Sequence, residues 1–113
     1  MKPISTALRE LMTDRGMSVE DVWLAAGLGG PSGVYRYLKG DRGRLVNSQS
    51  APVIEKIARA LGVAPDYFLE YRAFAVREVV RRYPDLADAV YDILIEAARL
   101  RGFGVESKDR DAL

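Results

Sequence analysis

Apolar residues recur along the chain at spacings of three and four, and glycine and proline divide this pattern into segments. Such spacing places apolar side chains on one face of a helix, whereas a strand would show sustained alternation. We therefore expect an all-α chain. The expected helices cover residues 4–15, 19–26, 32–39, 52–61, 65–82 and 85–101.

The residues that flank each segment set its expected ends. Gly16, Gly27 and Gly40 each follow a helical segment, where glycine readily takes the left-handed conformation that ends a helix. Ser18 precedes the second segment and can accept a hydrogen bond from the backbone N–H two or three residues on. Asp21 adds a negative charge favourable at that helix N-terminus.

The later boundaries depend on proline. Pro65 is expected to open one continuous fifth helix, because proline is tolerated in a first helical turn. Pro84 is expected to stop that helix, and Asp85 and Asp88 are expected to act as cap and first-turn acid of the sixth helix. Between the third and fourth helices, residues 41–51 are polar and form a long loop.

Missing residue types exclude most catalytic chemistry. The chain has no Cys and no His, which removes thiol nucleophiles, the usual general base near neutral pH and the commonest metal ligands. The longest uncharged stretch, residues 22–35, contains four glycines and a proline and is too short to span a bilayer. We expect a cytoplasmic protein without enzymatic activity, metal, cofactor or membrane association.

A glycine turn at residues 27–31 joins the second and third helices, which is the arrangement of a helix–turn–helix. The segments MSVEDV (17–22), GL (27–28), PSGVYRYLKG (31–40) and IARALGV (57–63) resemble the lambda-repressor-like, XRE-type family of DNA-binding domains over about residues 4–70. The resemblance implies a lambda-repressor-like helix–turn–helix domain followed by two C-terminal amphipathic helices. It also implies a cytoplasmic, nucleoid-associated transcription regulator.

Two positions depart from the pattern of that family. Val19 stands where the family usually has a glutamine that holds a DNA phosphate, so that contact is not carried over. Trp23 stands where a small alanine is usual. Judged from the residue type and its position in the second helix, Trp23 is more simply an anchor of the core than a base-stacking residue.

The third helix is expected to enter the major groove of double-stranded DNA. Val34 and Leu38 would pack inward, with Tyr37 partly buried against the fourth helix. Arg36 is the best candidate for base readout, because its planar fork matches the O6 and N7 acceptors of guanine. The expected DNA-binding residues of this helix are Ser32, Gly33, Tyr35, Arg36 and Lys39.

Gly33 and the following loop carry alternatives. Gly33 either permits a close approach of the backbone to DNA or is a poor helix former left over from the turn. Arg42 and Arg44 are expected to bind backbone phosphates, with Asn47, Ser48, Gln49 and Ser50 as small donors, although a merely solvated loop is the alternative.

Net charge argues for DNA only when it is divided along the chain. The total is +1, and by itself gives no sign of a nucleic-acid partner. Residues 30–59 hold six basic and two acidic residues, a local +4, whereas residues 84–98 hold four acidic residues and no basic one. The charge pattern therefore favours the third helix as the DNA-facing surface. The acidic sixth helix would be repelled by phosphate and is expected to face a partner or solvent.

The last two helices are expected to form a homodimer, because two-fold dimers place two recognition helices one DNA turn apart on a palindromic site. Arg77, Arg81 and Arg82 could pair with the acids of the sixth helix, within one chain or across the dimer. A hairpin within a monomer is the alternative, and this end also resembles, more loosely, actinobacterial XRE-type nucleoid-associated regulators. The expected interface residues are Phe74, Val79, Leu86, Val90, Ile93, Leu94, Ala97 and Leu100.

These observations predict a DNA-binding domain over residues 1–70, dimerisation helices over residues 71–102 and a disordered tail over residues 103–113. The predicted function is a sequence-specific DNA-binding transcription regulator, a repressor or phage-type immunity repressor. The alternative is a protein–protein adaptor or antitoxin-like protein that uses the two C-terminal helices.

Overall fold

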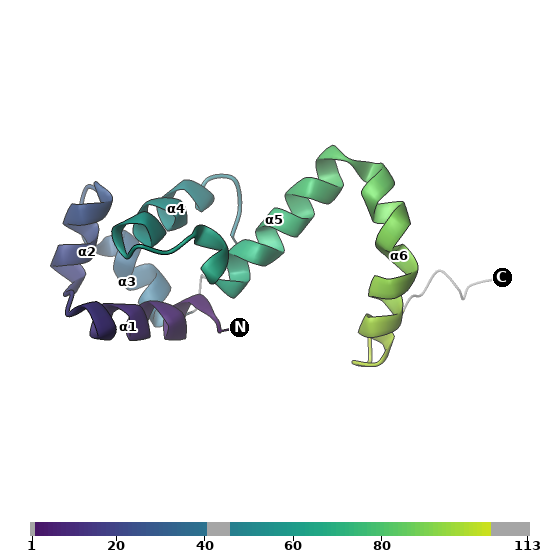
Figure 1. The fold of residues 1–113 in the computed structure, drawn as a ribbon, viewed down its shortest axis with the longest axis horizontal. Helices are drawn as coiled ribbons and strands as arrows, with labels where there is room; N and C mark the ends of the chain where they lie inside the picture. Colours follow the sequence, from purple (N-terminus) through teal and green to yellow (C-terminus); the bar gives the residue numbers. More distant parts are fainter. Residues whose placement is uncertain (1, 41–45, 105–113) are drawn as a thin grey trace. The chain divides into compact units, whose positions relative to one another are not determined.

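A computed structural model describes residues 2–40 and 46–104, and every regular element in that part of the chain is helical (Figure 1). The elements are α1 (Ile4–Arg15), α2 (Val19–Ala26), α3 (Ser32–Lys39), α4 (Ala51–Ala60), the 3₁₀ turn η1 (Pro65–Tyr67), α5 (Leu69–Arg82) and α6 (Pro84–Arg99). The chain divides into two compact units, Met1–Arg77 and Glu78–Leu113. The all-α expectation is confirmed, and the first three helices have the predicted bounds.

Local capping explains why α2 begins where the sequence predicts. The Ser18 hydroxyl accepts from the Asp21 N–H at 3.1 Å, and the Ser18 N–H donates to Asp21 Oδ2 at 2.9 Å. This reciprocal pair satisfies two backbone donors that a helix N-terminus otherwise leaves without partners. The hydrogen bond from the Ser18 backbone also lowers the pKa of the Asp21 carboxyl, followed by the contribution of the Ser18 side chain.

The predicted continuous helix over residues 65–82 is wrong. η1 ends at Tyr67, and Phe68 takes an extended conformation with φ −97° and ψ 131° before α5 begins. The Phe68 side chain is 0% exposed, and the edge of its ring meets Tyr67 at a centroid distance of 5.8 Å. Burial of this phenylalanine accompanies the break, and tertiary packing here outweighs the local helical spacing of the sequence.

The start of the sixth helix also differs from the prediction. Pro84 is the first residue of α6 rather than only the stop of α5, and Tyr83 occupies the N-cap position without a side-chain cap bond. Proline suits this position, because the first N–H of a helix has no partner within the helix. Asp85 therefore lies in the first turn instead of capping it, and α6 ends at Arg99 rather than at Arg101.

The hydrophobic core lies in the first unit, where α1 to α4 gather around it (Figure 1). Trp23 packs against this core and is partly buried, as expected of an anchor. Tyr37 was expected to be partly buried but is only 2% exposed, because α3 directs its ring fully into the core. The buried residues are Ile4, Ala7, Leu8, Leu11, Val22, Val34, Tyr37, Val46, Ala51, Ile54, Ile57, Ala58, Leu61 and Phe68.

None of the helices in residues 2–40 and 46–104 is long and apolar enough to cross a membrane.

Candidate nucleic-acid interface

One face of α3 is turned away from the core and carries the predicted recognition residues. Ser32, Tyr35, Arg36 and Lys39 are all exposed, at the i, i+3, i+4 and i+7 spacing of one helical face. The opposite face buries Val34 and Tyr37, so packing fixes the rotation of the helix about its axis. Tyr35, the residue before Arg36, is 50% exposed.

Gly33 lies on the inner flank of the same helix. A Cβ built on this glycine would meet the Leu28 and Val53 side chains, each at 3.6 Å, which is ordinary van der Waals contact. The missing side chain therefore faces protein rather than the exposed face of α3. A close approach of DNA to the Gly33 backbone stays a prediction.

The C-terminal end of α3 is held by α1, which the sequence did not predict. Arg9 Nη2 donates to the Leu38 carbonyl at 3.0 Å, and Gly40 ends the helix at φ 83°. Arg9 satisfies one of the carbonyls that a helix end leaves without a partner and places a positive charge there. The two residues are 29 positions apart, so no local signal in the sequence could have linked them.

The N-terminus of α2 presents carboxylates rather than phosphate-binding groups. Val19 is partly buried against the core, and the Ser18 hydroxyl is used by the cap. Glu20 and Asp21 occupy the first turn and are exposed. Carboxylates there would repel a phosphate, so the departure at Val19 is matched by a local environment that does not favour a phosphate contact.

The turn before α4 is closed by side-chain hydrogen bonds and carries exposed polar residues. Asn47 Oδ1 accepts from the backbone N–H groups of Gln49 and Ser50, each at 2.9 Å, and the Ser50 hydroxyl accepts from the Asn47 N–H at 2.9 Å. Asn47 and Ser50 thus use their side-chain oxygens within the turn, whereas the side chains of Ser48 and Gln49 are exposed. Arg42 and Arg44 lie outside the described residues.

An exposed apolar surface lies along α6, and we call it the α6 apolar face. It is made of Leu86, Val90, Ile93, Leu94, Ala97 and Leu100. Ile93 is 75% exposed and Leu100 is 81% exposed, values typical of side chains that the described part of the chain leaves in solvent. The predicted interface residues of α6 therefore share one uncovered face.

The two predicted interface residues on α5 differ from each other. Val79 is exposed, whereas Phe74 is partly buried against the core of the first unit, with its ring 5.6 Å from that of Tyr71. Phe74 has much of its surface covered within the chain. The proposed interface therefore depends mainly on the α6 apolar face.

Two of the three arginines near the end of α5 have partners other than the acids of α6. Arg77 donates to the Val46 carbonyl at 2.6 Å, and Arg81 pairs with Glu78 of its own helix at 2.9 Å. The Glu78 carboxylate raises the pKa of Arg81 through a hydrogen bond and then through its charge. Pairing of these arginines with α6 acids across a dimer stays a prediction.

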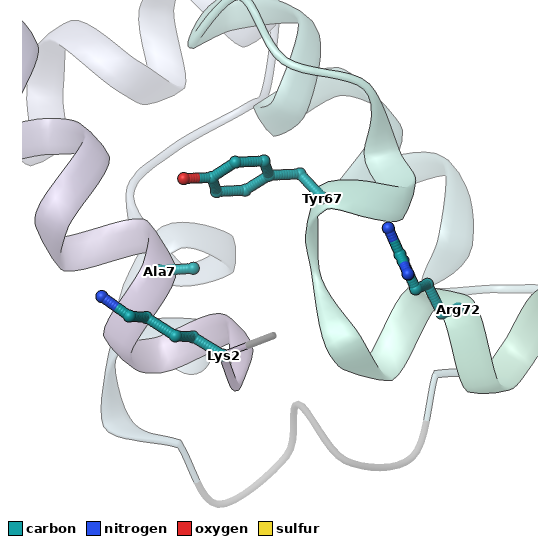
Figure 2. Close-up of a pocket in the computed structure, with 4 residues that line it drawn as sticks. All are labelled: Lys2, Ala7, Tyr67 and Arg72. Atoms are coloured by element: carbon teal, nitrogen blue, oxygen red, sulfur yellow. The ribbon is translucent and has the colours of Figure 1, made fainter.

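A cavity of about 360 Å³ opens beside the start of α1 and is lined by Lys2, Ala7, Tyr67 and Arg72 (Figure 2). The Tyr67 ring extends over it toward α1. Both cations are engaged within the protein: Lys2 Nζ binds Glu10 at 2.7 Å, and Arg72 Nε donates to the Asp66 carbonyl at 2.7 Å. Over the described part of the chain, no three acidic residues are placed to hold a metal ion.

Comparison with known proteins finds one family. The family described as Cro/C1-type HTH DNA-binding domain matches residues 7–73, which is more than half of the chain. No curated protein and no solved structure matches the chain.

Proposed function

Because the chain belongs to the Cro/C1-type helix–turn–helix DNA-binding family and is a DNA-binding transcription regulator, we propose that it represses transcription as a homodimer on a palindromic site. The observation that carries the DNA-reading part of this proposal is the exposed face of α3. Its serine, tyrosine, arginine and lysine side chains share one side of a helix whose other side is fixed in the core. A repressor of this kind can act simply by occupying its palindromic site on DNA.

Within that face, Arg36 is the proposed reader of a base. Its planar guanidinium can donate two parallel hydrogen bonds to guanine O6 and N7 in a fixed geometry. Ser32, Tyr35 and Lys39 surround it and are proposed to contact the flanking bases and phosphates. Gly33 is proposed to contribute only if the backbone itself approaches DNA.

Phosphate contacts are proposed for the segment between α3 and α4. Ser48 and Gln49 lie in the hydrogen-bonded turn before α4, close in sequence to Arg42 and Arg44, which are proposed to neutralise phosphates. These contacts position the protein and make binding dependent on salt, but they carry no sequence information.

Dimerisation is proposed through the α6 apolar face. A soluble chain gains free energy by covering such a face, at about 25 cal/mol per Å² of apolar surface removed from water. A two-fold dimer would bring two copies of α3 to half-sites about 34–36 Å apart. This role supports a division into a DNA-binding domain over about residues 1–70 and dimerisation helices over residues 71–102.

The first test measures binding of the full chain to DNA fragments selected from a random pool. We expect a palindromic site and a log–log salt slope of about −5 to −7 if six to eight phosphates are neutralised per dimer. Arg36→Ala should cost about 1–3 kcal/mol on that site and relax the preference at one base pair. Equal weakening on all sequences would instead make Arg36 a phosphate contact, and a flat salt dependence would contradict the phosphate contacts.

The second test measures the mass of the protein in solution by sedimentation. Ile93→Glu places a charge in the α6 apolar face and should convert the dimer to a monomer. Tyr91→Glu is the matched control, because it adds the same charge to the same helix at an exposed position outside that face. A wild-type chain that is monomeric at all concentrations would contradict the homodimer and favour an adaptor that covers this face with another protein.

A further inference from the structure

Three polar contacts join the first three turns of α5 to the part of the first unit built from α1 to α4, which we call the DNA-binding unit. Each contact is made with a different segment. Glu70 Oε1 accepts from the Ile4 N–H at 2.8 Å, and the Tyr71 hydroxyl donates to Glu55 Oε2 at 2.6 Å. Arg77 Nη2 donates to the Val46 carbonyl at 2.6 Å. The acceptors and donors on the other side lie in α1, in α4 and in the turn that precedes α4.

The contact with α1 supplies a cap that α1 itself lacks. Pro3 is the N-cap residue and makes no side-chain cap bond, and the first turn contains no acidic residue. Glu70 provides both the acceptor and the negative charge that a helix N-terminus favours. The first turn of α5 is thus part of how the DNA-binding unit is completed.

The contact with α4 is a hydrogen bond between a neutral phenol and a carboxylate. Tyr71 is partly buried, and the bond to Glu55, with burial second, raises the pKa of its hydroxyl to about 12. The tyrosine therefore remains a donor at every physiological pH. Hydrogen bonds to charged acceptors are among the stronger ones in proteins.

The contact with Val46 lies farther along α5 than the contacts of Glu70 and Tyr71. Arg77 lies six residues beyond Tyr71, which is about 9 Å along a helix. Contacts at two separated points restrain the direction of a helix more firmly than contacts confined to its first turn, where Glu70 and Tyr71 both lie. Val46 is itself fully buried, so its carbonyl is a fixed anchor.

We propose that Tyr71 and Arg77 are positioning residues that fix the course of α5 on the DNA-binding unit and thereby set the half-site spacing that the dimer accepts. This inference rests on the proposed homodimer. The chain reaches its dimerisation helices only through α5, so the direction of α5 at Arg77 limits where the second DNA-binding unit can lie. One added base pair moves a half-site by about 3.4 Å and rotates it by about 34–36°, which a fixed helix cannot follow.

The experiment measures the affinity of the full chain for duplexes whose two selected half-sites are separated by the preferred spacing, by one or two base pairs fewer, or by one or two more. A duplex with a single half-site reports on the DNA-binding unit alone, and sedimentation reports on the dimer. The test variant is Tyr71→Phe combined with Arg77→Met, and each single substitution is measured as well. Tyr67→Phe and Arg82→Met are the controls, because they remove the same groups without removing either contact.

For wild type and both controls, we expect affinity to fall at least about tenfold when the spacing changes, which corresponds to about 1.4 kcal/mol. For the double variant we expect the same dimer and the same affinity for a single half-site. Its affinities for duplexes of different spacing should differ by less than about threefold. A double variant that keeps the sharp wild-type preference would overturn the inference while leaving the homodimer intact. A wild-type dimer that accepts all spacings equally would also overturn it, and a wild-type monomer would contradict the proposed function itself.

Either single variant keeps the test decisive if the double variant does not fold, because each removes one of the two contacts named in the proposal and leaves the Glu70 contact in place. The expected single-variant result is an intermediate loss of spacing preference. Loss that appears equally in Arg82→Met would show that positive charge on α5, rather than the Val46 contact, is responsible.

Discussion

Gly33→Ala is the substitution at which the structure makes the least obvious prediction, because it should stabilise a protein at its proposed DNA-reading helix. Gly33 is the second residue of α3 and is not among the glycines with positive φ. Glycine within a helix costs up to about 1 kcal/mol relative to alanine, mainly through backbone entropy. The added Cβ would rest 3.6 Å from both Leu28 and Val53, so no atom has to move.

The expected gain can be converted to a melting temperature. Partial burial of one methyl group adds at most a few tenths of a kcal/mol to the propensity term, since complete burial is worth about 0.8 kcal/mol. The sum is about 1 kcal/mol, which corresponds to a rise in Tm of about 4–8 °C for a domain of 60–100 residues. Thermal unfolding followed by circular dichroism measures it.

Gly40→Ala is the matched control for this experiment. Gly40 has φ 83°, and its Cβ would lie 3.2 Å from the Ser5 hydroxyl oxygen, so the same substitution should lower Tm there. A fall in Tm for Gly33→Ala would refute the reasoning from the Cβ position. Unchanged DNA affinity is expected as well, and a loss of affinity in the stabilised variant would instead place DNA against the Gly33 backbone.

Three further predictions concern the cap formed by Ser18 and Asp21 and the hydrogen bond between Tyr71 and Glu55. Ser18→Ala should cost about 1 kcal/mol of stability, because it removes the acceptor of the α2 cap, and an unchanged Tm would contradict that role. Asp21 has a lowered pKa, so its contribution to stability is present above the pKa of the unfolded state and is lost as pH falls through the pKa of the folded state. Denaturation at a series of acid pH values should therefore show a smaller loss of stability with falling pH in Asp21→Asn than in wild type. Tyr71 has a pKa raised from 10.0 to about 12, so its contribution is complete below pH 10 and is lost as pH rises toward 12. Urea denaturation across that window should show a flatter profile in Tyr71→Phe, and identical profiles would contradict the bond to Glu55.

The parts of the fold that the sequence predicts are those decided within a few residues. The ends of α1 and α2 depend on Gly16, Gly27 and the cap at Ser18, all of which act on their own turn of helix. The exposed face of α3 follows from the spacing of its apolar residues in the same way. Helix periodicity and capping are sufficient here because the tertiary structure agrees with them.

The break at Phe68 and the contacts of Arg9, Glu70 and Arg77 depend on residues far apart in the chain. Glu70 and Ile4 are 66 positions apart, and Arg77 and Val46 are 31 positions apart. An arginine or glutamate on a helix surface has the same local pattern whether it faces solvent or caps another helix. Only the packing of α1, α4 and α5 distinguishes the two cases, so periodicity could not have found these residues.

This difference explains why the sequence indicates the proposed DNA-reading face better than it indicates how two copies in the proposed homodimer would lie on DNA. A recognition face is a property of one helix and is encoded by the residues of that helix. The spacing between two such faces depends on every contact that directs the chain between them, and those contacts pair residues from separate helices. Glu70 shows the consequence, because a side chain in the first turn of α5 also caps α1, and neither element alone predicts the other. Substitutions in α5 should therefore alter half-site spacing while leaving the preferred bases unchanged, whereas substitutions on the exposed face of α3 should do the reverse.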